Sequence, residues 1–210
     1  LHVREGYRDG GRPKTRNVLI EIAVEGLDHG ESWRADLEFD YANAESFYCR
    51  ARAGTDGTRQ QIPAAAAELR LAYLPPMSGL AANETRLDEG AIGVRIGEGR
   101  TAEVLRNLCW QAHQRSADGW RQIVERMRKL FGVALDDPEY IKERGEIAMT
   151  YRTGRGVQLG LSACGRGQQQ TLLLLAHMAA NPGAVLLLDE PDAHLEILRQ
   201  RQIYDVLDRK

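Results

Sequence analysis

Lysine is the residue whose scarcity says most about this sequence. Lysine and arginine together number 28 in 210 residues, but nearly all of them are arginine. The lysines are Lys14, Lys129, Lys142 and Lys210. A loop that wraps the β- and γ-phosphates of a nucleotide needs GxxxxGK followed by serine or threonine. None of these lysines follows a glycine, so the sequence contains no such loop.

Other scarcities exclude whole classes of protein. No apolar run approaches the roughly 18 residues of a membrane span, and the first residues lack the apolar core of a secretory signal. The 3 cysteines, Cys49, Cys109 and Cys164, include no CxxC pair, which favours reduced thiols over a disulfide framework or a zinc site. The formal net charge of −2 gives no bulk attraction to nucleic acid or membrane. These features predict a cytoplasmic protein with no membrane partner.

The hydropathy pattern changes its period along the chain. Residues 33–41 alternate apolar and charged side chains, as in a half-solvated antiparallel strand, whereas apolar residues recur at helical spacing after residue 100. We expect a loop over 1–16, strands over 18–26, 33–41, 46–51, 68–76, 146–152 and 184–190, and helices near 105–112, 120–131, 168–180 and from 195. This order predicts an antiparallel β-rich lobe (1–99), a helical lobe (100–145) and an α/β core segment (146–210).

Four apolar residues run directly into two acids in VLLLDE, residues 185–190. A strand that is apolar on both faces is typical of a parallel sheet covered by helices, and the carboxyl ends of such strands are where α/β proteins bind ligands. This is the Walker B pattern, in which Asp189 would orient the water shell of Mg²⁺ and Glu190 would polarise the attacking water. The alternative is a strand that simply ends in an Asp-Glu-Pro turn.

A second stretch, LSACGRG at residues 161–167, lies just before an expected helix. Backbone N–H groups there, together with the helix dipole and Arg166, would form a seat for an anion. The alternative is a glycine-rich turn that leads into a buried helix.

Together these stretches resemble the ATPase heads of the ABC superfamily, in the branch with SMC proteins, RecF and OLD-like "AAA family" ATPases. The resemblance is carried by LSACGRGQQQ as the signature motif, a buried helix, VLLLDE as Walker B and PDAHLE as the D-loop. It covers residues 160–200 closely. The β-hairpins at 18–50 resemble that family's antiparallel subdomain more loosely.

The resemblance implies an α/β P-loop NTPase head of ABC type, with an antiparallel β subdomain and a helical lobe. Two such heads enclose two ATP molecules and Mg²⁺, so the expected partner is a second copy or a related head. Asp189 would serve the metal and Glu190 the attacking water. Groups that contact the nucleotide from the opposite head would be Ser162, Gly165 and Gly167 with Arg166 beside them, and Ala193 and His194 of the D-loop.

The sequence departs from the family pattern at two places. Cys164 stands at a signature position that is usually glycine, and YLPPMSGL (73–80), where a Q-loop would lie, contains no glutamine, which leaves Ser78 or Asn83 as substitutes. In the family the phosphate loop precedes the β-hairpins and a switch histidine follows the D-loop helix. Both would fall outside residues 1–210. We therefore expect a truncated ATPase head that binds ATP weakly and hydrolyses none by itself.

Family analogy places the parent ATPase in DNA repair, DNA maintenance or defence against foreign DNA, with DNA or a nuclease as a candidate partner. Two other classes of function stay open. One is a non-catalytic adaptor head that lends its signature motif to a competent partner. The other is a metal-dependent nuclease that uses Asp189, Glu190, Asp192 and Glu196 directly.

Overall fold

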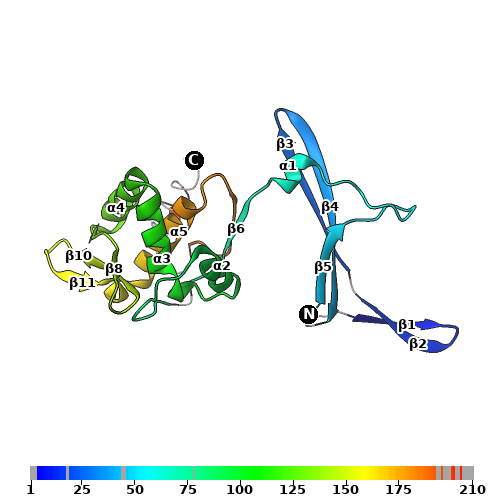
Figure 1. Ribbon diagram of the computed structural model, residues 1–210, viewed down its shortest axis with the longest axis horizontal. Coiled ribbons are helices and arrows are strands. Elements are labelled where there is room, and N and C mark those ends of the chain that lie inside the picture. The colour runs from blue at the N-terminus through cyan, green and yellow to red at the C-terminus, as the bar shows by residue number, and fades with distance from the viewer. Residues whose placement is uncertain are drawn as a thin grey trace. The chain divides into compact units, whose positions relative to one another are not determined.

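The computed structural model describes residues 4–17, 19–43, 46–77, 79–192, 195, 200–201 and 204. The chain divides into two units, Leu1–Leu69 and Arg70–Lys210 (Figure 1). The boundary falls after Leu69, whereas the sequence placed the end of the β-rich part at residue 99. The first unit is mainly antiparallel sheet and the second mixes helices with short strands. The described residues are therefore mixed α/β, as expected.

A three-stranded antiparallel sheet in the order β3-β4-β5 forms the body of the first unit. Its strands are β3 (Leu19–Asp28), β4 (Glu31–Asn43) and β5 (Ser46–Ala51), and a short helix, α1 (Ala64–Ala67), follows them. On the charged face of β4, Glu38 pairs with Arg50 at 2.7 Å. On the other face, Phe39 stacks on Phe47. The alternation predicted for residues 33–41 is confirmed, because successive side chains of a strand point to opposite faces.

The loop expected over residues 1–16 is wrong. Strands β1 (Arg4–Asp9) and β2 (Arg12–Asn17) form an antiparallel hairpin there. Gly10 and Gly11 connect them with φ values of 56° and 82°. Two left-handed residues in a row make a tight turn whose twist matches that of a hairpin, and glycine adopts this conformation without steric cost. The glycine pair that suggested a chain breaker is the hairpin turn.

Three helices form the core of the second unit: α3 (Leu105–Arg115), α4 (Ala117–Phe131) and α5 (Arg166–Ala180). They pack against one another (Figure 1). Helix α4 begins after Ser116, whose hydroxyl accepts from the Gly119 N–H at 3.0 Å, and ends at Gly132 with φ of 67°. A serine N-cap and a left-handed glycine are favourable helix ends. The helices predicted near 105–112, 120–131 and 168–180 are confirmed.

Short strands complete the second unit: β7 (Ala134–Leu135), β8 (Glu139–Ile141), β9 (Glu146–Ala148), β10 (Thr150–Arg152) and β11 (Gln158–Gly160). The single strand expected over 146–152 is wrong, because it breaks at Met149. The Met149 side chain is buried, and its carbonyl accepts from the Leu161 N–H at 3.0 Å. As a result β9 pairs with β8, while β10 pairs with β7 and β11.

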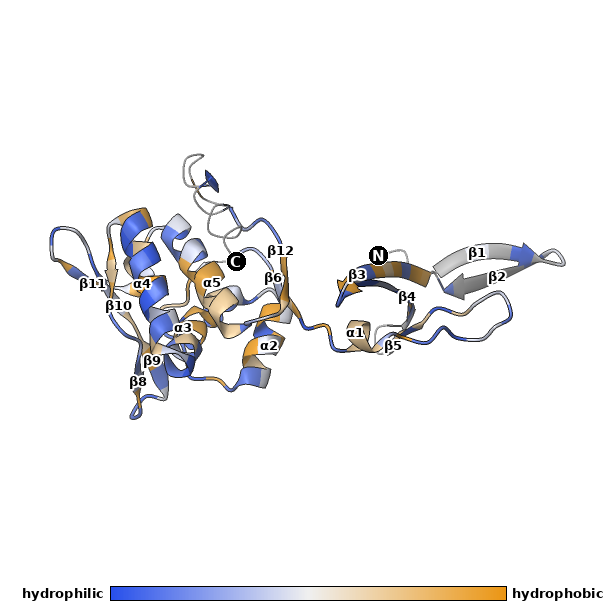
Figure 2. Cartoon of the chain, turned by 90° about the horizontal axis from the view of Figure 1, so that it is seen from above, coloured by the Kyte–Doolittle hydropathy of each residue, from blue (hydrophilic) through white to orange (hydrophobic). Residues whose placement is uncertain are grey.

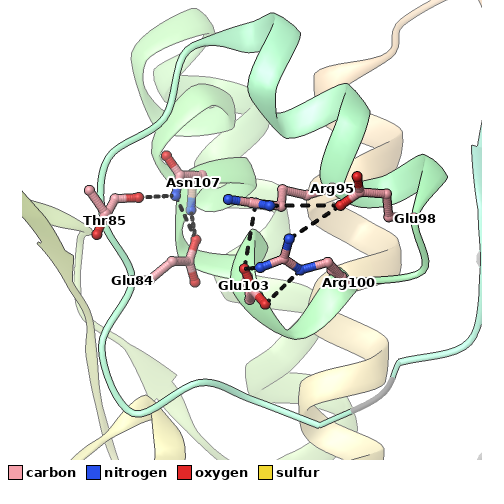
Figure 3. Close-up of polar contacts among 7 residues, drawn as sticks. All are labelled: Glu84, Thr85, Arg95, Glu98, Arg100, Glu103 and Asn107. Atoms are coloured by element: carbon pink, nitrogen blue, oxygen red, sulfur yellow. Dashed lines mark hydrogen bonds and ion pairs between the residues drawn. The ribbon is translucent and has the colours of Figure 1, made fainter.

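A buried carboxylate anchors the segment that joins β6 (Leu71–Leu74) to α2 (Glu89–Gly97). Glu84 is 2% exposed and accepts from the backbone N–H groups of Arg106 at 2.9 Å and Asn107 at 2.6 Å. The Asn107 side chain also donates to Glu84 at 2.8 Å and to the Thr85 carbonyl at 2.9 Å (Figure 3). Burial raises the pKa of Glu84, and the hydrogen bonds from Arg106 and Asn107 oppose that rise. Glu84 thus satisfies N–H groups that the first turn of α3 would leave without partners.

Candidate functional site

Strands β6 and β12 (Val185–Leu188) form a parallel pair in which Val185 lies opposite Leu71 and Leu188 opposite Leu74. β12 lies beside β6 and is hydrophobic along its length (Figure 2). The N–H of Asp189 donates to the Leu74 carbonyl at 3.0 Å, directly after the strand. The strand is shorter than the expected 184–190, so Asp189 lies at the shared carboxyl end of the pair, where α/β sheets bind ligands.

The two faces of this parallel pair differ in burial. Leu186 and Leu188 pack against the core of the unit. On the opposite face, Val185 is 45% and Leu187 49% exposed. The expectation that helices cover both faces of this strand is therefore met on one face in the part of the chain that the structure describes.

Glu190 follows Asp189 in an uncommon backbone conformation. Its φ is 46°, in the left-handed region, and both carboxylates are exposed. A left-handed residue other than glycine costs about 1–3 kcal/mol and is found preferentially at functional sites. Both carboxylates are accessible to water, to a cation and to an anionic ligand.

The donor set at this strand end fits Mg²⁺ better than a cation that needs several protein ligands. Within the described ranges, no group of three His, Cys, Asp or Glu side chains could hold a metal ion. Mg²⁺ is usually bound by one or two carboxylates and keeps waters and substrate phosphates as its other ligands. Asp189 can supply such a carboxylate. The nuclease alternative also needs Glu196, which lies outside the described residues.

The stretch LSACGRG joins β11 to α5 through the 3₁₀ turn η2 (Leu161–Ala163). Ser162 lies in this turn, and Gly165 is the N-cap of α5. Ser162, Gly165 and Arg166 are exposed, and Gly167 is half-buried. The first turn of α5 carries no acidic residue, so the positive end of the helix dipole and the Arg166 guanidinium both favour an anion here.

Two residues of this loop, Leu161 and Cys164, are buried in the core. Cys164 is the one that departs from the family pattern. Its side chain is buried against Tyr151, and its N–H donates to the Leu161 carbonyl at 3.1 Å. Burial raises the pKa of the Cys164 thiol to about 11, and a hydrogen bond with Tyr151 opposes the rise. The cysteine that departs from the family pattern is thus a packed, unreactive thiol, because thiolate is the reactive form.

This burial predicts how the cysteines react with a thiol reagent at pH 8. Cys49 is exposed, whereas Cys109 and Cys164 are buried, and burial raises the pKa of Cys109 as well. We expect one fast thiol in the folded protein, measured by absorbance with a disulfide reagent, and 3 after unfolding. Cys49→Ser is expected to remove the fast phase. A fast thiol in that variant would contradict the burial of Cys109 or of Cys164.

The three glutamines in the first two turns of α5 were assigned no role from the sequence, yet each makes a hydrogen bond in the structure. Gln168 accepts from the Gly165 N–H at 3.2 Å, and Gln169 donates to the Cys164 carbonyl at 2.9 Å. Gln170 accepts from the Met77 N–H at 3.1 Å. A run of polar residues at the start of a buried apolar helix is a usable signal, because buried polar groups need partners.

Some predicted residues cannot be placed in this site. Ala193 and His194, predicted to contact the nucleotide, lie outside the described residues, as does Ser78. Asn83 is exposed beside the buried Glu84. The Asp192 carbonyl accepts from the Leu195 N–H at 3.2 Å.

Comparison with known proteins gives one informative match. A family model described as "AAA domain, putative AbiEii toxin, Type IV TA system" matches residues 86–210. The matched region includes the LSACGRG loop, α5, β12 and the two acids that follow it. The chain belongs to this family. An AAA domain implies nucleotide binding and ATPase activity, and such domains generally bind ATP and Mg²⁺.

Two further observations accompany this match. The search of curated proteins returns no match to the chain. Among the described residues, no helix combines the length and the apolar character that crossing a membrane requires.

Proposed function

We propose that this chain is the signature- and Walker B-bearing portion of an ATP-hydrolysing head of ABC type, in the branch with SMC proteins, RecF and OLD-like ATPases. The observation that carries the proposal is the exposed Asp189–Glu190 pair at the carboxyl end of the β6–β12 parallel pair. This pair lies inside the region that matches an AAA domain.

Each acid has its own role in the proposed reaction. A bound Mg²⁺ ion would supply positive charge that offsets the charge of the nucleotide phosphates. Asp189 would hold the water shell of that ion. Glu190 would accept a proton from the water that attacks the γ-phosphorus, so that the bond to ADP breaks and inorganic phosphate leaves. The exposure of both carboxylates supports this division of roles, because water and nucleotide must reach them.

The second part of the proposal concerns dimerisation. Two heads would enclose ATP, with Ser162, Gly165, Arg166 and Gly167 of one head meeting the γ-phosphate bound by the other. The exposed helix start at Arg166, free of acidic residues in its first turn, supports this arrangement. Ala193 and His194 would complete the contact as part of the D-loop.

The biological setting is proposed from the family alone. The matched family carries the words toxin and type IV toxin–antitoxin system in its description. This favours defence against foreign DNA over DNA repair or maintenance, with DNA or a nuclease as a candidate partner. The proposed location is the cytoplasm.

Mixing two inactive variants of the natural protein tests the arrangement in trans. Ser162→Arg spoils the signature loop but leaves its own acids intact, whereas Glu190→Gln does the reverse. A mixed dimer then contains one site with both halves intact and one with neither. We expect each variant alone to be nearly inactive and the mixture to regain phosphate release, measured against total protein.

A matched control uses Val157→Arg, which adds the same side chain at an exposed position before the loop. It should retain wild-type turnover. A mixture that stays inactive, when both variants fold and bind ATP, would oppose the trans arrangement. ATP binding without hydrolysis in the wild type would instead favour the adaptor alternative.

A further inference from the structure

The segment 75–77, which directly follows β6, is held by polar side chains from two sides. The Thr101 hydroxyl, from the 3₁₀ turn η1 (Thr101–Glu103), donates to the Pro76 carbonyl at 3.2 Å. From the other side, the Gln170 side chain accepts from the Met77 N–H at 3.1 Å. Met77, Thr101 and Gln170 are all buried. The backbone of this segment is therefore fixed relative to α5.

The position of Gln170 in α5 shows which elements this contact joins. Gln170 is 1% exposed and lies on the second turn of the helix, one turn beyond Arg166. Its neighbour Gln169 donates to the Cys164 carbonyl at 2.9 Å and so holds the loop that precedes the helix. Gln170 thus joins the start of α5, which carries the LSACGRG loop, to the segment after β6.

The same segment connects to the acids at the end of β12. The Asp189 N–H bonds the Leu74 carbonyl at 3.0 Å, one residue before segment 75–77 begins. A path of hydrogen bonds and short stretches of backbone therefore runs from Asp189 through Leu74 and Met77 to Gln170. The last link crosses 93 positions of sequence through one side chain.

An apolar residue would serve packing better at this place. Gln170 is followed by residues 171–176, all buried, and most of them are leucine. A buried amide is costly unless it is hydrogen-bonded, and the Met77 N–H would lose its partner without it, at about 1–3 kcal/mol. The side-chain oxygen of Gln170 is thus committed to the Met77 N–H, and this hydrogen bond links the two candidate site elements.

We infer that Gln170 is a positioning residue for ATP turnover. Through its hydrogen bond to Met77 it holds the acidic strand end at Asp189 in a fixed position relative to the LSACGRG loop. This inference rests on the proposed function. When a nucleotide binds at Asp189 and Glu190, this contact would transmit the change to the LSACGRG loop of the same head. The position that the loop presents to a partner head would then depend on whether nucleotide is bound.

Gln170→Met in the natural protein tests the link, because methionine keeps the length of the side chain but cannot accept the hydrogen bond. We expect kcat to fall roughly tenfold to a hundredfold, since small misplacements of reacting groups have effects of that size. The KM for ATP should change less than about threefold, because the acids and their own nucleotide contacts are untouched. Hydrogen exchange should show ATP-dependent protection of residues 158–167 in the wild type and its loss in the variant.

Two controls separate positioning from plain stability. Met127→Ala, in the core of α4 and fully buried, should lower the free energy of unfolding yet retain kcat and the ATP-dependent protection. Gln122→Met makes the same chemical change at an exposed position of α4 and should change neither kcat nor the ATP-dependent protection.

The other possible results would each contradict the inference. If Gln170→Met keeps wild-type kcat per folded molecule, the inference is overturned while the proposed ATPase stands. The same holds if Met127→Ala lowers kcat as much as Gln170→Met does. If the wild type hydrolyses no ATP, the proposed function and this inference fall together.

Discussion

Replacing Glu190 by glutamine is expected to lower ATP turnover of the natural protein by roughly 10²- to 10⁴-fold, the usual contribution of a general base. Glutamine keeps the shape of the side chain but cannot take a proton from the attacking water. ATP binding should persist, because the phosphates are held by other groups. Phosphate release measures the first effect and nucleotide binding the second. A closed dimer should accumulate in ATP and elute earlier in size-exclusion chromatography.

Asp192→Asn is the matched control for this variant. Asp192 lies two residues beyond Glu190, and its backbone carbonyl, not its side chain, makes the hydrogen bond to Leu195. We expect a much smaller loss of ATP turnover than in Glu190→Gln, because Asp192 lies in the proposed D-loop stretch and is not the proposed general base. Equal losses in both variants would instead support a cluster of acids acting together, as in the nuclease alternative. Unchanged turnover in Glu190→Gln would place the base elsewhere.

Replacing Glu84 by alanine is expected to lower the free energy of unfolding by about 3–5 kcal/mol, the cost of removing one partner from a buried ion pair. The change leaves the backbone N–H groups of Arg106 and Asn107 without their acceptor, and the Asn107 side chain keeps only its bond to the Thr85 carbonyl as a donor. It also leaves the Arg106 guanidinium, 3.6 Å from Glu84, without its buried counter-charge. Urea unfolding followed by circular dichroism measures the loss.

Glu103→Ala supplies the comparison, because Glu103 also pairs with arginines but on the surface. Its side chain is 39% exposed and lies 2.8 Å from Arg100 and 3.5 Å from Arg95 (Figure 3). Exposed pairs of this kind contribute about 1 kcal/mol or less. Similar losses in the two variants would show that burial of Glu84 adds nothing to stability.

Much of the local structure could be predicted because its cause is local. The alternation of residues 33–41 can be satisfied only by a strand with one charged face, and the apolar stripe of residues 120–131 only by a helix with one buried face. The errors arose where neighbouring residues permit two outcomes. Gly10 and Gly11 are compatible with a loop or a hairpin turn, and nothing local shows that residues 146–152 break at Met149.

The residues of the candidate site likewise fall into those that the local sequence predicts and those that depend on distant partners. The type and order of its acids are local properties of VLLLDE, so Asp189 and Glu190 could be named from the sequence, as could the glycine-rich start of α5. Residues that depend on distant partners could not. Glu84 meets Arg106 across 22 positions and Gln170 meets Met77 across 93, and no periodicity encodes such pairs.

By itself the sequence determined the longer strands and the helices α3, α4 and α5, and which residues can carry charge at the end of β12, because hydropathy period and residue chemistry act over a few neighbouring positions. Only the tertiary structure decided that β6 lies parallel to β12, that the Leu74 carbonyl receives the Asp189 N–H and that Gln170 reaches the segment after β6. Those outcomes depend on how α3, α4 and α5 bury their apolar faces together, since only that packing brings distant hydrogen-bonding groups within reach.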